Sequence, residues 1–256
     1  MPPESQKRLA GRVAVVTGAG RGLGRSVAAA FAAAGARVAL VDLPGDELAD
    51  AEATLRAAGH DVLAVGADVT DPGAVAALAA SVRAAFGPAR ILVNAAAILE
   101  ERPFLDCDLD SWGRTLAVNL TGPWLCCRAF VPEMVGSGRG SIINVTSRAG
   151  IEPFAGETAY CASKFGLEGF SRSLAIELGP HGVAVNLVTP GVSIKPTSLT
   201  LADFAALSPA QRARYVDSAT LTPAFLHLAI ADERGINGQR FSAHELAQRL
   251  GAGEAD

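Results

Sequence analysis

The chain has 256 residues, half of them hydrophobic and 5% aromatic, and a formal net charge of −4. This length allows one large α/β domain or two small ones, and the mildly acidic balance provides no basic surface for nucleic acid. No uninterrupted apolar run approaches the roughly 18–20 residues of a membrane span. We therefore expect neither nucleic acid nor a membrane as a partner.

Strand-like and helix-like segments alternate along the chain. The predicted strands are Val13–Thr17, Arg37–Asp42, Asp61–Ala67, Ile91–Asn94, Ser141–Thr146 and Val183–Val188. The predicted helices are Gly22–Ala34, Asp46–Ala58, Ala74–Phe86, Asp110–Met134 and Thr158–Leu178, the fourth bent by its prolines. Strands apolar on both faces are typical of a parallel sheet covered on each side. We predict a Rossmann-type doubly wound α/β fold, forming a single domain over residues 1–256.

This alternation weakens after Pro190. Residues 192–218 contain prolines, several Ser and Thr residues, and an Ala-rich stretch at Ala202–Leu207 that predicts a short helix. The segment is too long for a plain connection. Because it follows the carboxyl end of the sixth strand, where ligands bind in such sheets, we predict a substrate lid over about residues 192–222. An ordinary surface helix pair is the alternative.

Four cysteines bear on the cellular compartment. They are Cys107, Cys126, Cys127 and Cys161, and their spacing is not that of a metal site. The first twelve residues include no apolar segment of signal-peptide length. We expect reduced thiols, no metal and a cytoplasmic location, with Cys126 and Cys127 as buried packing residues rather than a redox pair.

A glycine-rich turn, Thr17-Gly18-Ala19-Gly20-Arg21-Gly22-Leu23-Gly24, follows the first predicted strand and begins the first helix. Glycines permit a tight turn, and a helix N-terminus presents free N–H groups and a positive dipole to a pyrophosphate. Asp42 ends the second strand, where an acid accepts hydrogen bonds from the adenosine ribose. The carboxylate favours NAD over NADP, whereas Arg21 could hold the extra phosphate of NADP.

Tyr160 and Lys164 are four residues apart, so on a helix they share one face. A phenol has a pKa of about 10, and a nearby cation lowers it. A tyrosine adjusted in this way exchanges a proton with an alcohol oxygen near neutral pH. A surface pair is the plain alternative. Ser147, which closes the fifth strand, and the glycine turn favour the catalytic interpretation.

Together these motifs resemble the short-chain dehydrogenase/reductase family, in its compact single-domain branch, over roughly residues 11–191. The motifs are Thr17-Gly18-x-x-x-Gly22-x-Gly24, Asp68-Val69, Asn94-Ala95-Ala96-Ala97, Asn119, Ser147, Tyr160-x-x-x-Lys164 and Asn186-x-x-x-Pro190-Gly191. The resemblance implies hydride transfer between a nicotinamide cofactor and a secondary alcohol or ketone.

The resemblance also implies roles for single residues. The catalytic group is Asn119, Ser147, Tyr160 and Lys164, with Tyr160 as general acid/base and Ser147 bonded to the substrate oxygen. Lys164 lowers the tyrosine pKa and holds the ribose, and Asn119 holds a water or is simply structural. The implied cofactor contacts are Gly18, Arg21, Gly22, Leu23, Gly24, Asp42, Asp68, Val69, Asn94, Ala95, Tyr160, Lys164, Pro190, Gly191 and Val192, with Asp68 and Val69 beside the adenine.

The chain departs from the family pattern at three places. Ala97 stands where the family usually has glycine, and Lys195 stands where a threonine often binds the carboxamide. Lys195 either meets cofactor phosphates or an acidic substrate, or remains in solvent. The usual C-terminal ending is replaced by Ile236–Ser242 and a predicted helical tail. Substrate specificity therefore does not carry over from the family.

Two functional classes remain, an oxidoreductase and a catalytically silent nucleotide-binding regulator, with a sugar epimerase as a third and weaker alternative. Retention of both Tyr160 and Lys164 favours the enzyme. The resemblance implies a homotetramer built through the two long helices, whose apolar residues exceed what one sheet face buries. They are Leu116, Val118, Leu120, Trp124, Leu125, Phe165, Leu167, Phe170 and Leu174. Burial of all of them inside one chain is the alternative.

Overall fold

A computed structural model describes residues 8–195, 199 and 201–253, and it contains one seven-stranded sheet. All neighbouring strands are parallel, in the order β3-β2-β1-β4-β5-β6-β7. Their bounds are β1 Val13–Thr17, β2 Arg37–Asp42, β3 Val62–Gly66, β4 Ile91–Asn94, β5 Gly140–Val145, β6 Val183–Thr189 and β7 Arg240–Ser242. The predicted doubly wound fold is confirmed, and the chain reverses its direction of winding between β1 and β4.

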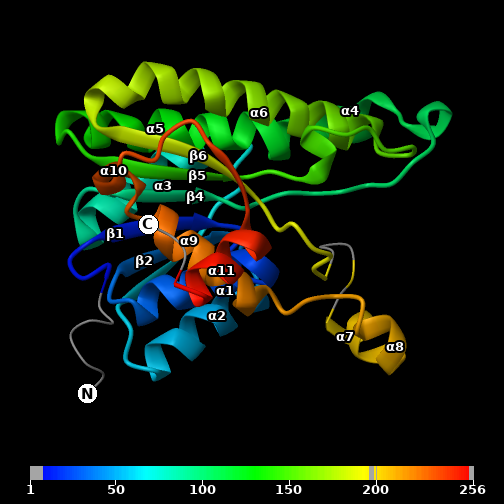
Figure 1. Ribbon diagram of the computed structural model, residues 1–256, viewed down its shortest axis with the longest axis horizontal. Helices are drawn as coiled ribbons and strands as arrows, with labels where there is room; N and C mark the ends of the chain where they lie inside the picture. The colour runs from blue at the N-terminus through cyan, green and yellow to red at the C-terminus, as the bar shows by residue number, and fades with distance from the viewer. Residues whose placement is uncertain (1–7, 196–198, 200, 254–256) are drawn as a thin grey trace.

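Helices cover both faces of this sheet (Figure 1). One face carries α1 Gly22–Ala33, α2 Asp46–Ala57, α9 Thr222–Leu228 and α11 Ala243–Gly251. The other face carries α3 Pro72–Phe86, α4 Leu109–Leu116, α5 Gly122–Gly136 and α6 Thr158–Leu178. None of the helices in the described parts of the chain has the length and apolar character that crossing a bilayer demands.

Each helical layer packs on its own hydrophobic core. Along β1, Ala14 and Val16 face the layer that contains α1, whereas Val13 and Val15 face the layer that contains α3 and α5. Every residue of β1 is therefore buried, which explains why the strand sequence shows no polar alternation. Cys126 and Cys127 are buried in the second core as free thiols, as expected.

Two elements differ from the sequence prediction. The single helix expected at Asp110–Met134 is divided into α4 and α5 by a π-helical turn at Ala117–Thr121. Pro123 is the second residue of α5, directly after this turn, and the backbone is helical at Leu116, Thr121 and Gly122. Because proline cannot donate a hydrogen bond to the preceding turn, the irregularity lies where a proline is expected to cause one. Strand β7 was not predicted, because three residues give too short a pattern, although the predicted helical tail is present as α11.

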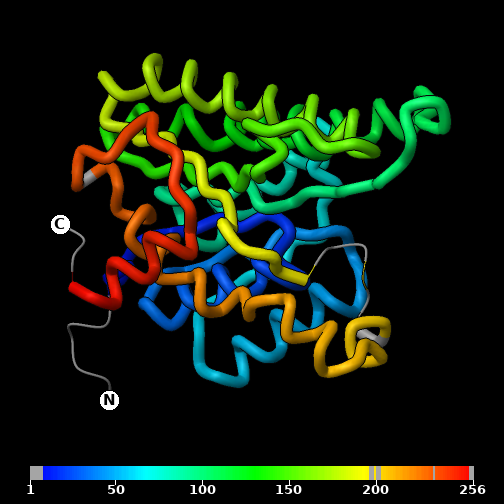
Figure 2. The backbone as a smooth tube through the Cα atoms, turned by 45° about the vertical axis from the view of Figure 1, so that its right-hand side comes forward, coloured from blue at the N-terminus to red at the C-terminus, as the bar shows by residue number. Residues whose placement is uncertain are grey.

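The segment after β6 leaves the sheet and returns to it. Residues 196–198 and 200, part of the predicted lid, lie outside the described residues. The predicted short helix is α7 Leu201–Ala206, followed by α8 Pro209–Arg212, and both lie at one edge of the molecule in Figure 1 and Figure 2. The Val216 N–H donates to the Ser193 carbonyl at 2.8 Å, which ties the returning chain to the departing one.

Candidate active site

A cavity of about 1640 Å³ opens at the carboxyl ends of the strands. Of the predicted site residues, those that line it are Gly18, Arg21, Gly22, Leu23, Gly24, Asp42, Asp68, Val69, Ala95, Ser147, Tyr160, Lys164, Pro190, Gly191 and Val192. Asn94 and Asn119 do not line it. The fold therefore brings segments that are far apart in sequence to one place, at the edge where doubly wound sheets bind ligands.

The glycine turn has the form that close approach of a ligand requires. Gly18 and Gly22 have φ angles of +68° and +56°, which favour glycine. A Cβ at Gly24 would lie 2.1 Å from the Gly18 carbonyl oxygen, and one at Gly18 would lie 2.9 Å from the Ala96 nitrogen. The turn is thus packed directly against its own helix and the end of β4, and its backbone forms an open cradle that suits a pyrophosphate.

Asp42 is fixed beside this cradle. Its carboxylate accepts hydrogen bonds from the Gly20 N–H at 2.9 Å and from the Leu43 N–H at 2.8 Å. Arg21 turns toward Glu47, with 3.5 Å between guanidinium and carboxylate. Lys195 lines the cavity, is half-buried and donates to the Leu199 carbonyl at 2.5 Å. Burial lowers the pKa of Lys195, and the charge of Arg21 lowers it further.

Asp68 and Val69, which were predicted to flank the adenine, line the same cavity. One Asp68 carboxylate oxygen accepts from the Thr70 N–H and the Thr70 hydroxyl, both at 2.8 Å. Val69 is buried against Gly122 of α5, where a Cβ would approach its side chain to 2.9 Å. These contacts fix both side chains, and together with Asp42 and the glycine cradle they fit a dinucleotide.

Ser147, Tyr160 and Lys164 meet at the other end of the cavity. Ser147 begins the short 3-10 helix η4 (Arg148–Gly150), and its hydroxyl accepts from the Ala149 N–H at 3.2 Å. Tyr160 lies in the first turn of α6, and Lys164 lies one turn later. The Lys164 ammonium donates to the Val145 carbonyl at 2.9 Å and lies 5.6 Å from the centroid of the Tyr160 ring.

Burial controls the pKa values of this group. It raises the pKa of the Tyr160 hydroxyl, a hydrogen bond with Ser147 lowers it, and the negative charge of Glu157 raises it again. Burial also lowers the pKa of Lys164 to about 8. In this arrangement the ammonium is directed to the Val145 carbonyl, and desolvation is the largest influence on the pKa of Tyr160. The expected lowering of that pKa by Lys164 stays a prediction.

The two predicted asparagines act behind the cavity wall. The Asn119 amide accepts from the Ile98 N–H and donates to the Ile98 carbonyl, both at 2.9 Å, and donates to the Ser163 hydroxyl at 3.1 Å. Asn94 donates to the Asn144 side chain at 2.8 Å. Asn94 thus connects β4 to β5, and Asn119 connects the loop after β4 to α6. This explains why neither predicted contact reaches the cavity.

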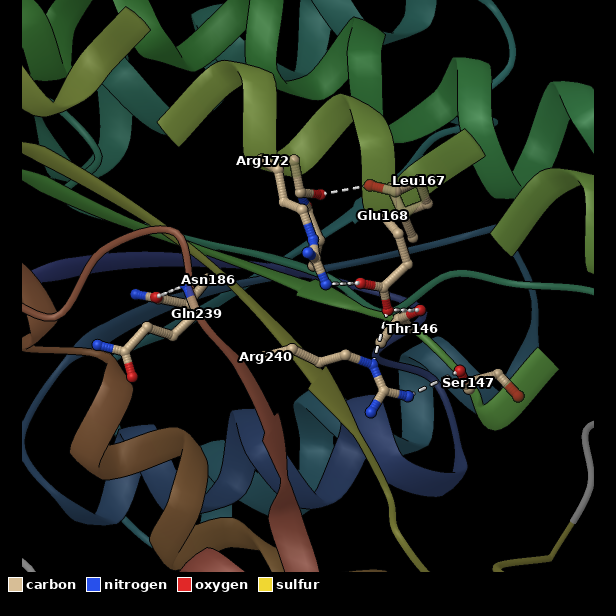
Figure 3. Close-up of polar contacts among 10 residues, drawn as sticks. Thr146, Ser147, Leu167, Glu168, Arg172, Asn186, Gln239 and Arg240 are labelled. Carbon is tan, nitrogen blue, oxygen red and sulfur yellow. Dashed lines mark hydrogen bonds and ion pairs between the residues drawn. The ribbon is translucent and has the colours of Figure 1, made fainter. Parts of the chain in front are cut away.

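The cavity also contains side chains that the sequence analysis missed. Glu157 lies one turn before Tyr160, and Arg240 reaches the cavity from β7. Figure 3 shows Arg240 directed toward Glu168 of α6 and toward the Ser147 backbone. Glu168 follows Lys164 by four residues, so the sequence could have placed both on one face of the helix. Nothing in the sequence indicates that Glu168 contacts Arg240. In the described part of the chain, no cluster of three or more His, Cys, Asp or Glu side chains could hold a metal ion.

A dinucleotide cradle and a Ser-Tyr-Lys group in one cavity define a nicotinamide-dependent oxidoreductase. A family model described as short chain dehydrogenase matches residues 12–202. The chain belongs to the short-chain dehydrogenase family, and it acts on CH–OH groups with a nicotinamide cofactor.

Two curated relatives illustrate the relationship. D-threitol dehydrogenase of Mycolicibacterium smegmatis is 43% identical over 188 residues, which is 72% of this chain and 71% of the relative. The 3-alpha-(or 20-beta)-hydroxysteroid dehydrogenase of Mycobacterium tuberculosis is 42% identical over 192 residues, which is 74% of this chain and 72% of the relative.

Solved structures extend the similarity beyond the matched region. Carveol dehydrogenase from Mycobacterium avium in complex with NAD has a TM-score of 0.83 and 27% identity, covering 93% of this chain and 99% of the other. A metagenomic short-chain oxidoreductase in complex with NADP has a TM-score of 0.77 and 34% identity, covering 91% and 98%. Relatives of this fold therefore bind either cofactor.

Proposed function

We propose that this enzyme transfers hydride between NAD and a secondary alcohol or ketone, with Tyr160 as the proton-transfer group. The observation that carries this proposal is the meeting of Ser147, Tyr160 and Lys164 in the cavity that also contains the glycine cradle. When bound, the nicotinamide accepts or supplies the hydride. The side chains of the protein bind the cofactor and substrate, orient them and transfer the proton.

Each member of the group has a distinct part in that work. Tyr160 takes the proton from the alcohol oxygen during oxidation and returns it during reduction. Ser147 donates a hydrogen bond to the same oxygen and steadies the charge that develops there. Lys164 holds the ribose hydroxyls and favours the phenolate when the site is loaded. Asn119 supports the group indirectly, since it holds Ile98 in the cavity wall.

A substrate panel tests the reaction class. Nicotinamide absorbance is followed with NAD and secondary alcohols that include polyols, cyclic diols and hydroxysteroids, chosen because relatives carry such names. The proposal expects substrate-dependent NADH formation with at least one of them. Binding of NAD without turnover across the panel supports instead a silent nucleotide-binding regulator.

We propose a homotetramer assembled through the two long helical segments, α4 with α5 and α6. Of the apolar residues predicted for this interface, Leu167 is buried inside the chain, whereas Trp124 and Phe165 are 46% and 47% exposed. Exposed aromatic side chains on long outer helices favour closed assembly. Light scattering at micromolar concentration should give about four times the 26.2 kDa chain mass. A stable, fully active monomer contradicts the assignment, and Trp124→Asp should reduce the mass.

We propose that residues 1–256 form one domain in which residues 192–222 act as a substrate lid. The segment follows β6 at the cavity, and its first residues, Val192 to Lys195, line that cavity. Closure would exclude water from the reacting atoms. Hydrogen exchange should show stronger amide protection across the segment when NAD and substrate are added. Protection equal to that of the central strands before any ligand is added contradicts a lid.

We propose a cytoplasmic location. All four cysteines are free, and two of them, Cys126 and Cys127, are buried without a disulfide partner. Free thiols are typical of proteins in reducing compartments. Cell fractionation tests this directly, and recovery in an extracellular or periplasmic fraction contradicts it.

A further inference from the structure

The backbone that carries Ser147 is held from behind by a buried carboxylate. Glu168 of α6 has a side chain that is 7% exposed, and one of its oxygens accepts from the Thr146 hydroxyl at 2.9 Å. Thr146 directly precedes Ser147 and is itself buried. Glu168 also lies one helical turn after Lys164, on the helix that carries Tyr160. The carboxylate therefore joins the helix of the catalytic tyrosine to the segment of the catalytic serine.

Arg240 completes this connection from the C-terminal strand. Its Nε donates to the same Glu168 oxygen at 2.8 Å, and its terminal Nη2 donates to the Ser147 carbonyl at 3.1 Å (Figure 3). The Ser147 carbonyl also accepts from the Gly150 N–H at 3.0 Å. Strand β7 places Arg240 beside Leu187 of β6, so the position of the guanidinium is set by the sheet.

The packing around this connection leaves little freedom. A Cβ at Gly150 would lie 2.8 Å from the Thr146 hydroxyl and 3.1 Å from Glu168 Cγ. A buried carboxylate needs a charged or hydrogen-bonding partner, because desolvation alone is costly. The planar guanidinium binds the carboxylate and the Ser147 carbonyl at once, a geometry that a lysine ammonium does not reproduce.

We propose that Arg240 and Glu168 are positioning residues that set Ser147 relative to Tyr160 and Lys164. The C-terminal strand then determines the geometry of the catalytic group, although it contributes none of its three members. This inference rests on the proposed function only in that Ser147 and Tyr160 act together. It gives a role to the C-terminal segment in which this chain departs from its family pattern.

Kinetics of four variants test the proposal on the substrate that the panel identifies. Arg240→Gln should lower kcat roughly ten- to hundredfold, since small misplacements of catalytic groups have effects of that size, while the NAD dissociation constant stays within about twofold. Arg172→Gln is the matched control. Arg172 is 57% exposed and pairs with Glu168 at 3.4 Å, and its bond is to the other carboxylate oxygen. Its kcat should remain within about twofold of wild type.

The remaining two variants separate positioning from stability. Arg240→Gln leaves the Glu168 charge buried without its guanidinium, which also lowers the melting temperature. Adding Glu168→Gln removes that charge, so the double variant should recover melting temperature but not kcat. Glu168→Gln alone keeps an oxygen for Thr146 and Arg240 and should lower kcat less than Arg240→Gln. Recovery of kcat together with stability in the double variant overturns the proposal, as does a raised KM with unchanged kcat in Arg240→Gln.

A second measurement does not depend on turnover. The chain has two tyrosines, Tyr160 and Tyr215, so labelling tyrosine with ¹³C at Cζ gives two resonances that Tyr215→Phe assigns. Arg240→Gln should shift the Tyr160 resonance, because displacement of Ser147 changes the hydrogen bond at the phenol, and Arg172→Gln should not. An unmoved Tyr160 resonance in Arg240→Gln overturns the proposal. If the wild-type protein shows no turnover, the proposed function is refuted. The resonance shift in Arg240→Gln compared with Arg172→Gln then still tests whether Arg240 positions Ser147.

Discussion

Replacing Tyr160 by phenylalanine should lower kcat for alcohol oxidation by ~10²–10⁴-fold, the usual loss when a proton-transfer group is removed. The phenol is the titratable hydroxyl beside Ser147, with the Lys164 ammonium 5.6 Å from its ring. The ring itself remains in the variant, so NAD binding should be unchanged. Steady-state kinetics and a binding titration on the same preparation measure both quantities. A rate near that of wild type shows that another group transfers the proton.

The pH dependence provides a companion test. Oxidation requires the phenolate, and burial raises the pKa of Tyr160, so kcat/KM should rise with pH and this rise should disappear in Tyr160→Phe. The charge of Glu157 also raises that pKa, so Glu157→Gln should move the rise to lower pH. Glu152→Gln is the control, because Glu152 lines the same cavity but pairs with Arg148 at 3.4 Å. A shift to higher pH in Glu157→Gln contradicts the assignment.

The second large effect concerns the cofactor, where NAD should be used with a kcat/KM at least about 10²-fold higher than that of NADP. The 2′-phosphate of NADP would approach the Asp42 carboxylate. At ~4 Å and an effective dielectric of ~20, each unit of like charge costs about 4 kcal/mol before relaxation. Two backbone N–H groups hold that carboxylate in place, so it does not readily turn away. Arg21, by contrast, is paired with Glu47 at 3.5 Å.

Two variants distinguish charge repulsion from general damage to the site. Asp42→Asn keeps the size of the side chain and removes the charge. It should reduce the preference for NAD over NADP, mainly by raising kcat/KM for NADP. Asp68→Ala, at the adenine end, should weaken binding of both cofactors alike. A clear preference of the wild-type protein for NADPH shows that Arg21 and Lys195 outweigh Asp42.

Local sequence patterns were sufficient to predict six of the seven strands and the grouping of Tyr160 with Lys164. The strands β1, β2, β4, β5 and β6 are short, mostly buried apolar runs, and such runs can be predicted without knowledge of the neighbouring strands. The edge strand β3 is only partly buried, but its run of apolar residues was predicted in the same way. Tyr160 and Lys164 lie on one helix, so their common face follows from helical spacing alone. The glycine turn could also be predicted from neighbouring residues alone, because a strand directly precedes it and a helix directly follows it.

The features that escaped prediction depend on distant parts of the chain. Arg240 and Glu168 are 72 residues apart and meet only because β7 joins the edge of the sheet. Asn94 was predicted to bind the cofactor, and Asn119 to hold a water or to be structural. The hydrogen-bond partners of both side chains lie on other elements, so they could not be predicted from local spacing. The raised pKa of Tyr160 likewise follows from its burial, which spacing on one helix does not reveal.

Direct transfer of the carbinol hydrogen tests the central claim most closely. The best alcohol of the panel, deuterated at the carbinol carbon, is incubated with the enzyme and NAD, and the nicotinamide product is analysed by mass spectrometry. The proposed function predicts one deuterium per NADH, and no labelled product with Tyr160→Phe on the same timescale. NADH without deuterium, or NAD bound with no NADH formed from any alcohol, contradicts hydride transfer in this site.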